Sequence, residues 1–185
     1  MPANIPTILL NNGYQLPVLG LGTAVRRDLG EADKTYEAVR AAIRAGYRLI
    51  DTAAAYGTEV EVGRAIKDAV AAGDVTRPEL VILTKVFMDS MSRPAVMESA
   101  RKSVENLGLE YVDILLVHWP MPVKAGTDLN EPDYSVDIHR DTWGGMEDVF
   151  MAGLAKTLGV SNYNAKQIEA LRKVSSNFGT NALIY

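Results

Sequence analysis

The sequence predicts an α/β fold built on a parallel sheet, and three observations lead to this prediction. Short apolar segments alternate with amphipathic segments along the chain, as in repeated strand–helix units. The expected strands are apolar throughout instead of alternating, which is typical of strands that are covered on both faces. No glycine-rich linker or change in composition divides the 185 residues, so we expect one domain over residues 1–185. The pattern fits a doubly wound sheet or part of a (β/α)8 barrel, which usually needs ~250 residues.

The expected elements follow from local composition. An Asn-Gly pair at 12–13, between two short apolar segments, predicts a β-hairpin over residues 7–17. The strands are apolar runs, and the run at 47–50 directly follows Gly46. The helices carry apolar residues along one face, and Gly46 and Gly108 are expected to end two of them. We expect six strands, at 19–22, 47–50, 79–86, 111–119, 157–160 and 181–185, and five helices, at 31–45, 58–72, 93–107, 141–154 and 165–174.

The composition restricts the function classes that need to be considered. The formal net charge of −4 gives no overall attraction to nucleic acid or to anionic membranes. No apolar run is long enough for a membrane-spanning helix, and the first residues do not resemble a secretory signal, so we expect a cytoplasmic protein. The absence of cysteine excludes disulfides and thiolate metal sites, and the two histidines lack metal-ligand spacing. We therefore expect no metal, no nucleic acid and no membrane partner.

Polar residues recur where the expected strands end. Asp51 follows the second strand, Lys85 and His118 lie at the ends of the third and fourth, and Ser161 and Asn162 follow the fifth. Each has an ordinary explanation, since an aspartate can cap a turn, a lysine can be solvated and a histidine can belong to the core. The carboxyl ends of parallel strands meet at one rim, however. Their repeated placement therefore predicts a site at this rim.

Several segments are similar to those of the aldo-keto reductases. "GYRLIDTAAAYGTEVEVG" resembles the family signature position by position, and "LTKV", "VDILLVHWP" and "LGVSNY" follow in the family's order. The resemblance implies an incomplete (β/α)8 TIM barrel with an N-terminal β-hairpin, and an enzyme that uses NADPH to reduce aldehydes, ketones or sugars. It also assigns residues to roles. The catalytic residues would be Asp51, Tyr56, Lys85 and His118, the cofactor-binding residues Gly22, Thr23, Asp51, Ser161 and Asn162, and the substrate-binding residues His118 and Trp119.

The implied chemistry explains why these residue types are needed. Hydride transfer to a carbonyl carbon leaves negative charge on the oxygen, which has to be protonated or stabilised as it develops. Tyr56 would be the general acid, although a free phenol has a pKa of ~10. The Lys85 ammonium would favour release of the phenolic proton, and Asp51 would keep Lys85 charged and oriented. His118 would donate a hydrogen bond that orients the carbonyl group.

The polar, turn-rich segment 123–141 is expected to be a long loop, of the kind that often carries function in compact domains. Trp119 follows His118 directly, and Trp143 lies at the start of the next helix. Two interpretations remain for these indoles. Trp119 would form an aromatic wall for an aldehyde or a polyol, or both indoles would simply pack beneath the loop.

The sequence departs from the family pattern at three places. Ala24 occupies the position of a tryptophan that often lines the substrate pocket, and Ala182 and Ile184 replace a glutamine and an acid in the sixth strand. We expect a C-terminally truncated barrel, without the segment that holds the cofactor's 2′-phosphate. Its first and last strands would be unpaired edges that favour self-association. An alternative hypothesis is therefore a non-catalytic remnant that acts by binding a partner through an open edge.

Two other function classes are disfavoured because their motifs are incomplete or absent. "GLGTAV" at 20–25 begins like a dinucleotide-binding fingerprint, but Val25 stands where the third glycine belongs. The acidic residue expected about 20 residues further on is also missing. A serine hydrolase is disfavoured further because the sequence contains no G-x-S-x-G.

Overall fold

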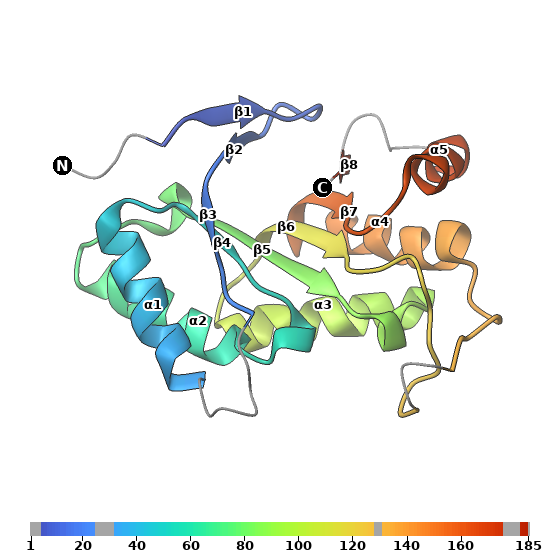
Figure 1. The fold of residues 1–185 in the computed structure, drawn as a ribbon, viewed down its shortest axis with the longest axis horizontal. Helices are drawn as coiled ribbons and strands as arrows, with labels where there is room; N and C mark the ends of the chain where they lie inside the picture. The colour runs from blue at the N-terminus through green and yellow to red at the C-terminus, as the bar shows by residue number, and fades with distance from the viewer. Residues whose placement is uncertain (1–4, 25–31, 128–130, 176–181, 185) are drawn as a thin grey trace.

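The protein forms an open parallel sheet with helices along one side, as the computed structural model in Figure 1 shows. The structure describes residues 5–24, 32–127, 131–175 and 182–184. The six-stranded sheet has the order β3-β4-β5-β6-β7-β8, and the hairpin β1–β2 forms a separate sheet. The strands are β1 (Thr7–Leu9), β2 (Gln15–Pro17), β3 (Gly20–Gly22), β4 (Leu49–Asp51), β5 (Val81–Val86), β6 (Val112–Val117), β7 (Ala155–Val160) and β8 (Ala182–Ile184). The α-helices are α1 (Ala32–Ala45), α2 (Glu59–Ala71), α3 (Arg93–Leu107), α4 (Trp143–Met151) and α5 (Ala165–Val174).

Every neighbouring pair in the large sheet is parallel and follows chain order, which is the connectivity of a (β/α) barrel. The prediction of an incomplete barrel with six strands and five helices is therefore confirmed. All residues of β5 and β6 are buried, which explains why these strands are apolar without alternation. The parallel pairing brings the carboxyl ends of β3 to β7 to the same rim, where the sequence predicts the site.

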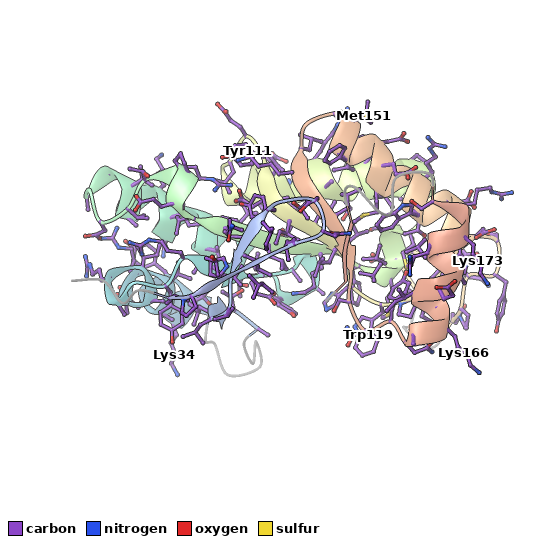
Figure 2. All side chains as sticks on the ribbon, turned by 90° about the horizontal axis from the view of Figure 1, so that it is seen from above. Lys34, Tyr111, Trp119, Met151, Lys166 and Lys173 are labelled. Atoms are coloured by element: carbon purple, nitrogen blue, oxygen red, sulfur yellow. The ribbon has the colours of Figure 1, made fainter. Side chains whose placement is uncertain are left out.

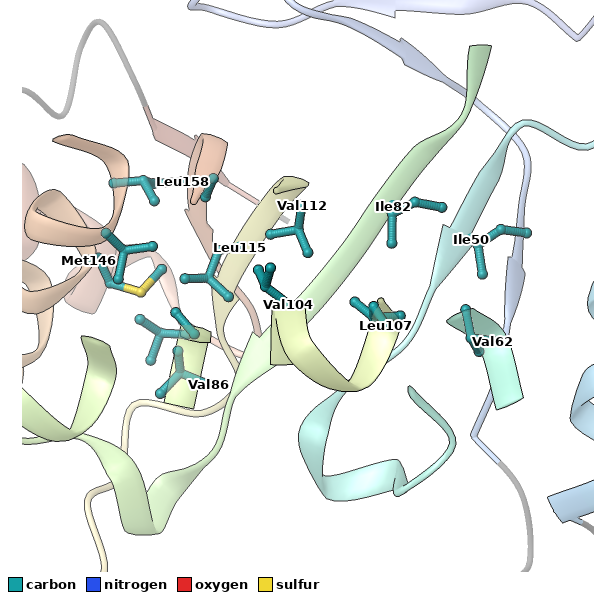
Figure 3. Packing of buried hydrophobic residues seen from close by; sticks show 14 of the residues in the cluster. Ile50, Val62, Ile82, Val86, Val104, Leu107, Val112, Leu115, Met146 and Leu158 are labelled. Atoms are coloured by element: carbon teal, nitrogen blue, oxygen red, sulfur yellow. The ribbon is translucent and has the colours of Figure 1, made fainter. Parts of the chain in front are cut away.

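Two hydrophobic layers hold the sheet in place. On the outer side, Ile50, Ile82 and Leu115 of the sheet pack with Val62 and Leu107 of the helices (Figure 3). On the inner side, the strands contribute a second cluster that includes side chains of the hairpin. The inner side chains of this open barrel pack against one another. The inner cluster consists of Leu10, Leu16, Leu49, Val81, Leu83, Ile114 and Leu116, with Tyr14 packed against it.

The hairpin covers the amino-terminal end of the inner layer, which confirms its prediction over residues 7–17. Its turn requires a left-handed residue, and Gly13 supplies it with φ of +82°. Asn12 Nδ2 donates a hydrogen bond of 3.0 Å to Thr157 Oγ1 of β7. Tyr14 Oη donates one of 2.9 Å to the buried carboxylate of Asp113 in β6. Burial and the nearby Asp113 raise the pKa of Tyr14, so the phenol remains a donor and keeps the hairpin attached.

The strand boundaries differ slightly from the predictions at the rim. β4 includes Asp51, which was expected just after the strand. β5 ends at Val86, as the expected strand 79–86 does, whereas β6 ends at Val117, before the expected end at 119, and leaves His118 just outside. The expected first residue of the helix 31–45 and both ends of the strand 181–185 lie outside the described residues.

The described residues of the segment 123–141 contain more secondary structure than the loop that the sequence predicts. Val123 pairs with Pro132 in an antiparallel bridge, and a π-helix, η5, covers Ile138–Thr142. Asp137 initiates this π-helix because its carboxylate accepts hydrogen bonds from two backbone N–H groups, those of His139 and Arg140. The helix expected at 141–154 therefore begins at Trp143, and it ends at Met151 before the left-handed Gly153. In the described part of the chain, no helix is long and apolar enough to cross a membrane.

Candidate active site

The structure brings the four predicted catalytic residues together at the carboxyl rim of the sheet. Asp51 is the last residue of β4, Lys85 lies near the end of β5, and His118 follows β6. Tyr56 lies in the 3-10 helix η2 (Ala54–Tyr56), in the connection between β4 and α2. The chain turns there into the left-handed Gly57, whose φ is +60°. This turn therefore places Tyr56 back beside the carboxyl end of β4, from which the chain has just emerged.

Lys85 is the centre of the site, and all three protons of its ammonium group have acceptors. Nζ donates to the Asp51 carboxylate, to the Thr52 carbonyl oxygen at 3.0 Å and to Tyr56 Oη at 3.3 Å. The Lys85 side chain is 4% exposed and that of Asp51 is 23% exposed. A buried ammonium is costly unless it is paired and hydrogen-bonded. The ion pair with Asp51 therefore keeps a charged lysine next to the tyrosine.

Tyr56 Oη accepts a hydrogen bond from Lys85, so this contact does not use the phenolic proton. The Lys85 ammonium also lies 4.8 Å from the centre of the Tyr56 ring. A cation at this place stabilises the negative charge that the phenol oxygen would carry after losing its proton. The geometry is therefore suited to proton donation by Tyr56.

His118 faces the Tyr56 ring edge-on, with 5.6 Å between the ring centres and 80° between the planes. Phe87, the second residue after Lys85, makes a similar contact with His118 at 5.8 Å. His118 is 7% exposed, and its Nδ1 has no hydrogen-bond partner among the described residues. Burial, and then the nearby Lys85 charge, lower the pKa of His118. The imidazole is therefore neutral at neutral pH and has one N–H to donate.

We expect the NMR titration of the two histidines to report this environment directly. The His118 ring protons should titrate with a midpoint below the ordinary value of ~6.5, because burial and Lys85 disfavour the charged form. The two histidine signals of the chain are distinguished by their loss in His118→Gln and in His139→Gln. A His118 midpoint at or above the ordinary value would contradict this description of the site.

The same shift has a consequence for stability. Between the lowered pKa of folded His118 and the ordinary value of ~6.5, the unfolded chain binds more protons than the folded chain. The stabilisation from neutral His118 is therefore present above that ordinary value and is lost as the pH falls below it. Urea denaturation at a series of pH values should show this loss in the wild type, whereas His118→Gln should lack it.

The two residues predicted after the fifth strand lie beside His118. Asn162 Nδ2 donates to the His118 carbonyl oxygen at 2.8 Å and to Ser161 Oγ at 3.0 Å. Asn162 has the left-handed φ of +62°, which is uncommon for a residue other than glycine. With these bonds made, the Ser161 hydroxyl proton and the Asn162 side-chain oxygen remain as one donor and one acceptor. This pair is complementary to a primary carboxamide such as that of nicotinamide.

Gly22 and Thr23 lie at the carboxyl end of β3, the strand that pairs with β4 on the side opposite to β5. Gly22 pairs with Asp51 in the sheet, and a Cβ atom at Gly22 would meet no other atom within 4 Å. Thr23 is 3% exposed, and its hydroxyl donates to the Asp51 carbonyl oxygen at 3.1 Å. Gly22 therefore leaves open space beside the rim, whereas the Thr23 side chain supports the backbone of Asp51.

Trp119 is 43% exposed and lies at the outside of the molecule (Figure 2). Its ring stacks on His118, with 6.4 Å between the ring centres and 26° between the planes. Trp143, by contrast, is 3% exposed and belongs to the outer core. The two indoles thus differ, and only Trp119 has a ring surface that is both accessible and next to the predicted site.

Sequence reasoning missed three contributors to this site. Phe87 packs against His118, the Thr52 carbonyl accepts from Lys85, and the buried Thr58 hydroxyl lies 3.3 Å from that of Thr23. Thr52 and Thr58 could have been found from the sequence, because both lie in the segment around Asp51 and Tyr56 that resembles the family signature. Phe87 has no such signal, because its contact depends on how β5 and β6 pair.

Comparison with known proteins links this arrangement to one family. A family model described as "Aldo/keto reductase family" matches residues 18–185. An aldo-keto reductase of Bombyx mori, AKR2E4, is 41% identical over 173 residues, which are 92% of this chain and 54% of the relative. An aldo-keto reductase of Mycolicibacterium vanbaalenii is 42% identical and covers 90% of this chain and 53% of its own length. The chain thus spans about half the length of the curated relatives it matches.

Solved structures show the same similarity. The crystal structure of the Bombyx mori protein AKR2E4 in complex with NADP superposes with a TM-score of 0.87 at 41% identity. The match covers 94% of this chain and 56% of that structure. The structure of the aldo-keto reductase AKR2E5 complexed with NADPH gives a TM-score of 0.86 at 37% identity, covering 94% and 52% of the two chains.

Proposed function

The chain belongs to the aldo/keto reductase family, and from this premise we propose that it carries the catalytic site of an NADPH-dependent reductase of aldehydes or ketones. We further propose that residues 1–185 belong to a single reductase domain and that the substrate is a small carbonyl compound or a sugar. The observation that carries the proposal is the hydrogen bonding of Lys85, which connects Asp51 to Tyr56. An ammonium group held in this position would stabilise the phenolate that forms when Tyr56 donates its proton.

When bound, NADPH would supply the hydride that is added to the carbonyl carbon. Tyr56 donates its phenolic proton to the carbonyl oxygen, so that the product is an alcohol. Lys85 stabilises the phenolate that remains, and Asp51 keeps the lysine in place. The N–H of neutral His118 orients the carbonyl oxygen toward Tyr56. Tyr56 regains its proton from water when the product leaves.

The residues present fit the nicotinamide half of the cofactor. Ser161 and Asn162 offer a donor and an acceptor for the carboxamide, and Gly22 leaves room for a flat ring beside Asp51. Trp119 offers an exposed aromatic surface next to His118, where the rest of the substrate would lie. These are proposed roles for Gly22, Ser161, Asn162 and Trp119, and Thr23 would act through the backbone that it supports.

We predict that the 185-residue chain binds NADPH weakly when it is expressed alone. The proposed contacts hold the nicotinamide half, and the family resemblance assigns none of residues 1–185 to the 2′-phosphate. Charge-assisted hydrogen bonds contribute roughly 1.5–3 kcal/mol each, so the loss of several raises the dissociation constant by orders of magnitude. Fluorescence titration of NADPH should therefore show weak binding, and binding should strengthen in a fusion that continues from residue 180 with the remaining segment of the Bombyx mori relative.

The same fusion, assayed for both NADPH binding and aldehyde reduction, tests the alternative hypothesis of a non-catalytic remnant. If the fusion binds NADPH and reduces an aldehyde, the site at the rim is competent and the remnant hypothesis is wrong. If the fusion binds NADPH tightly but reduces no carbonyl compound, the proposed function is wrong. Micromolar binding by residues 1–185 alone would contradict the argument from the missing contacts.

A further inference from the structure

Glu59 is a buried charged residue that the proposed reaction does not use. It is the first residue of α2 and lies three positions after Tyr56. Its exposed fraction is 3%, yet both donors to its carboxylate are neutral side chains. A buried carboxylate is costly to keep in a fold unless hydrogen bonds compensate for the lost water. Its place at the start of a helix adds a favourable interaction with the helix dipole.

The carboxylate of Glu59 connects three elements of the fold. Oε1 accepts a hydrogen bond of 2.7 Å from Thr84 Oγ1 in β5, and Oε2 accepts one of 3.0 Å from Asn106 Nδ2 in α3. Thr84 is fully buried and directly precedes Lys85 in the same strand. Glu59 therefore links the start of α2, which follows the Tyr56 turn, to the strand that carries the lysine.

A second contact fixes the same end of α2 against α3. A Cβ atom at Gly63 would lie 2.3 Å from the Leu107 carbonyl oxygen, so only glycine allows this approach of the two helices. Gly63 is one turn after Glu59, and Leu107 directly follows Asn106. Close packing at Gly63 and hydrogen bonding at Glu59 thus act on neighbouring points of one helix–helix contact. An open groove of about 750 Å³ lies between η2 and α3, and Ala54, Ala55 and Glu59 are among the residues that line it.

We propose that Glu59 is a positioning residue that sets the distance between the Tyr56 hydroxyl and the Lys85 ammonium. It does so by tying the helix that follows the Tyr56 turn to Thr84 beside Lys85. The effect of Glu59 on catalysis rests on the proposed function. The geometry itself can be tested without turnover, because the His118 ring lies edge-on to Tyr56 and senses its place.

NMR of the 185-residue chain provides this test. In Glu59→Ala the Tyr56 turn loses its link to β5, and we expect the His118 ring-proton signals to shift while those of His139 stay in place. Glu59→Gln keeps one acceptor oxygen and should give a smaller shift. Thr84→Val, which removes only the hydroxyl donor, should shift His118 in the same way. Glu61→Gln, on the same helix, is the matched control and should leave His118 unchanged.

The outcomes separate positioning from a purely structural role. If Glu59→Gln and Thr84→Val lower the unfolding temperature but leave the His118 signals at their wild-type positions, the proposal is wrong. Failure of Glu59→Ala to fold leaves the decision to those two variants. In a protein with NADPH-dependent turnover, Glu59→Gln should lower kcat by about tenfold or more at unchanged KM, because misplaced catalytic groups slow the chemical step. If Tyr56→Phe does not reduce that turnover, the proposed function fails, while the NMR result still decides the role of Glu59.

Discussion

Replacing Tyr56 by phenylalanine should reduce carbonyl turnover by at least ~10²-fold, the usual contribution of a positioned general acid. The substitution removes only the hydroxyl that accepts from Lys85 and would donate to the substrate. Lys85 keeps its bonds to Asp51 and to the Thr52 carbonyl, so we expect the fold and the affinity for NADPH to be retained. The rates are measured as aldehyde-dependent oxidation of NADPH in the fusion that binds the cofactor.

Tyr134→Phe is the matched control for this substitution. Tyr134 is 92% exposed, so loss of its hydroxyl should change neither turnover nor stability. Equal rates in the wild type and in Tyr56→Phe would show that another group supplies the proton, and the role proposed for Tyr56 would be wrong.

Replacing Lys85 by methionine should cost stability as well as activity. The change leaves the Asp51 carboxylate without its counter-ion and the Thr52 carbonyl without its donor. Breaking a buried ion pair from one side costs about 3–5 kcal/mol of unfolding free energy, and the partial exposure of Asp51 places this pair near the lower figure. Urea denaturation of residues 1–185 measures this loss, and turnover of the fusion should fall with it.

Lys102→Met provides the comparison. Lys102 pairs with Glu105 at 2.9 Å, but both side chains are more than half exposed, so its removal should change the unfolding free energy by less than about 1 kcal/mol. In the double variant Asp51→Asn/Lys85→Met the two losses of stability should not add, because each substitution removes the charge that the other would leave unpaired. A Lys85→Met variant as stable as Lys102→Met would contradict the description of a buried pair that holds the site together.

Helix ends with strong local signals could be predicted from the sequence to the residue. α3 ends at Leu107 because Gly108 takes the left-handed conformation, with φ of +62°. α5 begins after Asn164. The Asn164 side chain accepts a hydrogen bond from the Gln167 backbone N–H, and the Gln167 side chain accepts one from the Asn164 backbone N–H. The rim positions of Asp51, Lys85 and His118 could also be predicted, because they lie at the ends of apolar runs whose parallel pairing places these ends at one rim. Tyr56 was indicated by the family resemblance alone.

What could not be predicted depends on contacts between distant segments. The π-helix at η5 forms because the Asp137 side chain bonds two backbone N–H groups, which apolar periodicity does not reveal. The hydroxyl contacts among Thr23, Thr52 and Thr58 join β3 to the connection after β4. Glu59 looks like an ordinary charged residue at the start of a helix until Thr84 and Asn106 are brought beside it.

We propose that the site at the rim of the sheet catalyses the reduction of carbonyl groups by hydride transfer, with Tyr56 as the proton donor. The most direct measurement follows the hydride itself, with NADPH carrying deuterium at the transferable position and an aldehyde as substrate, in the cofactor-binding fusion. Mass spectrometry of the alcohol should find one deuterium at the former carbonyl carbon, and product formation should be almost lost in Tyr56→Phe. An alcohol without deuterium, or equal labelled product from the wild type and Tyr56→Phe, would contradict the claim.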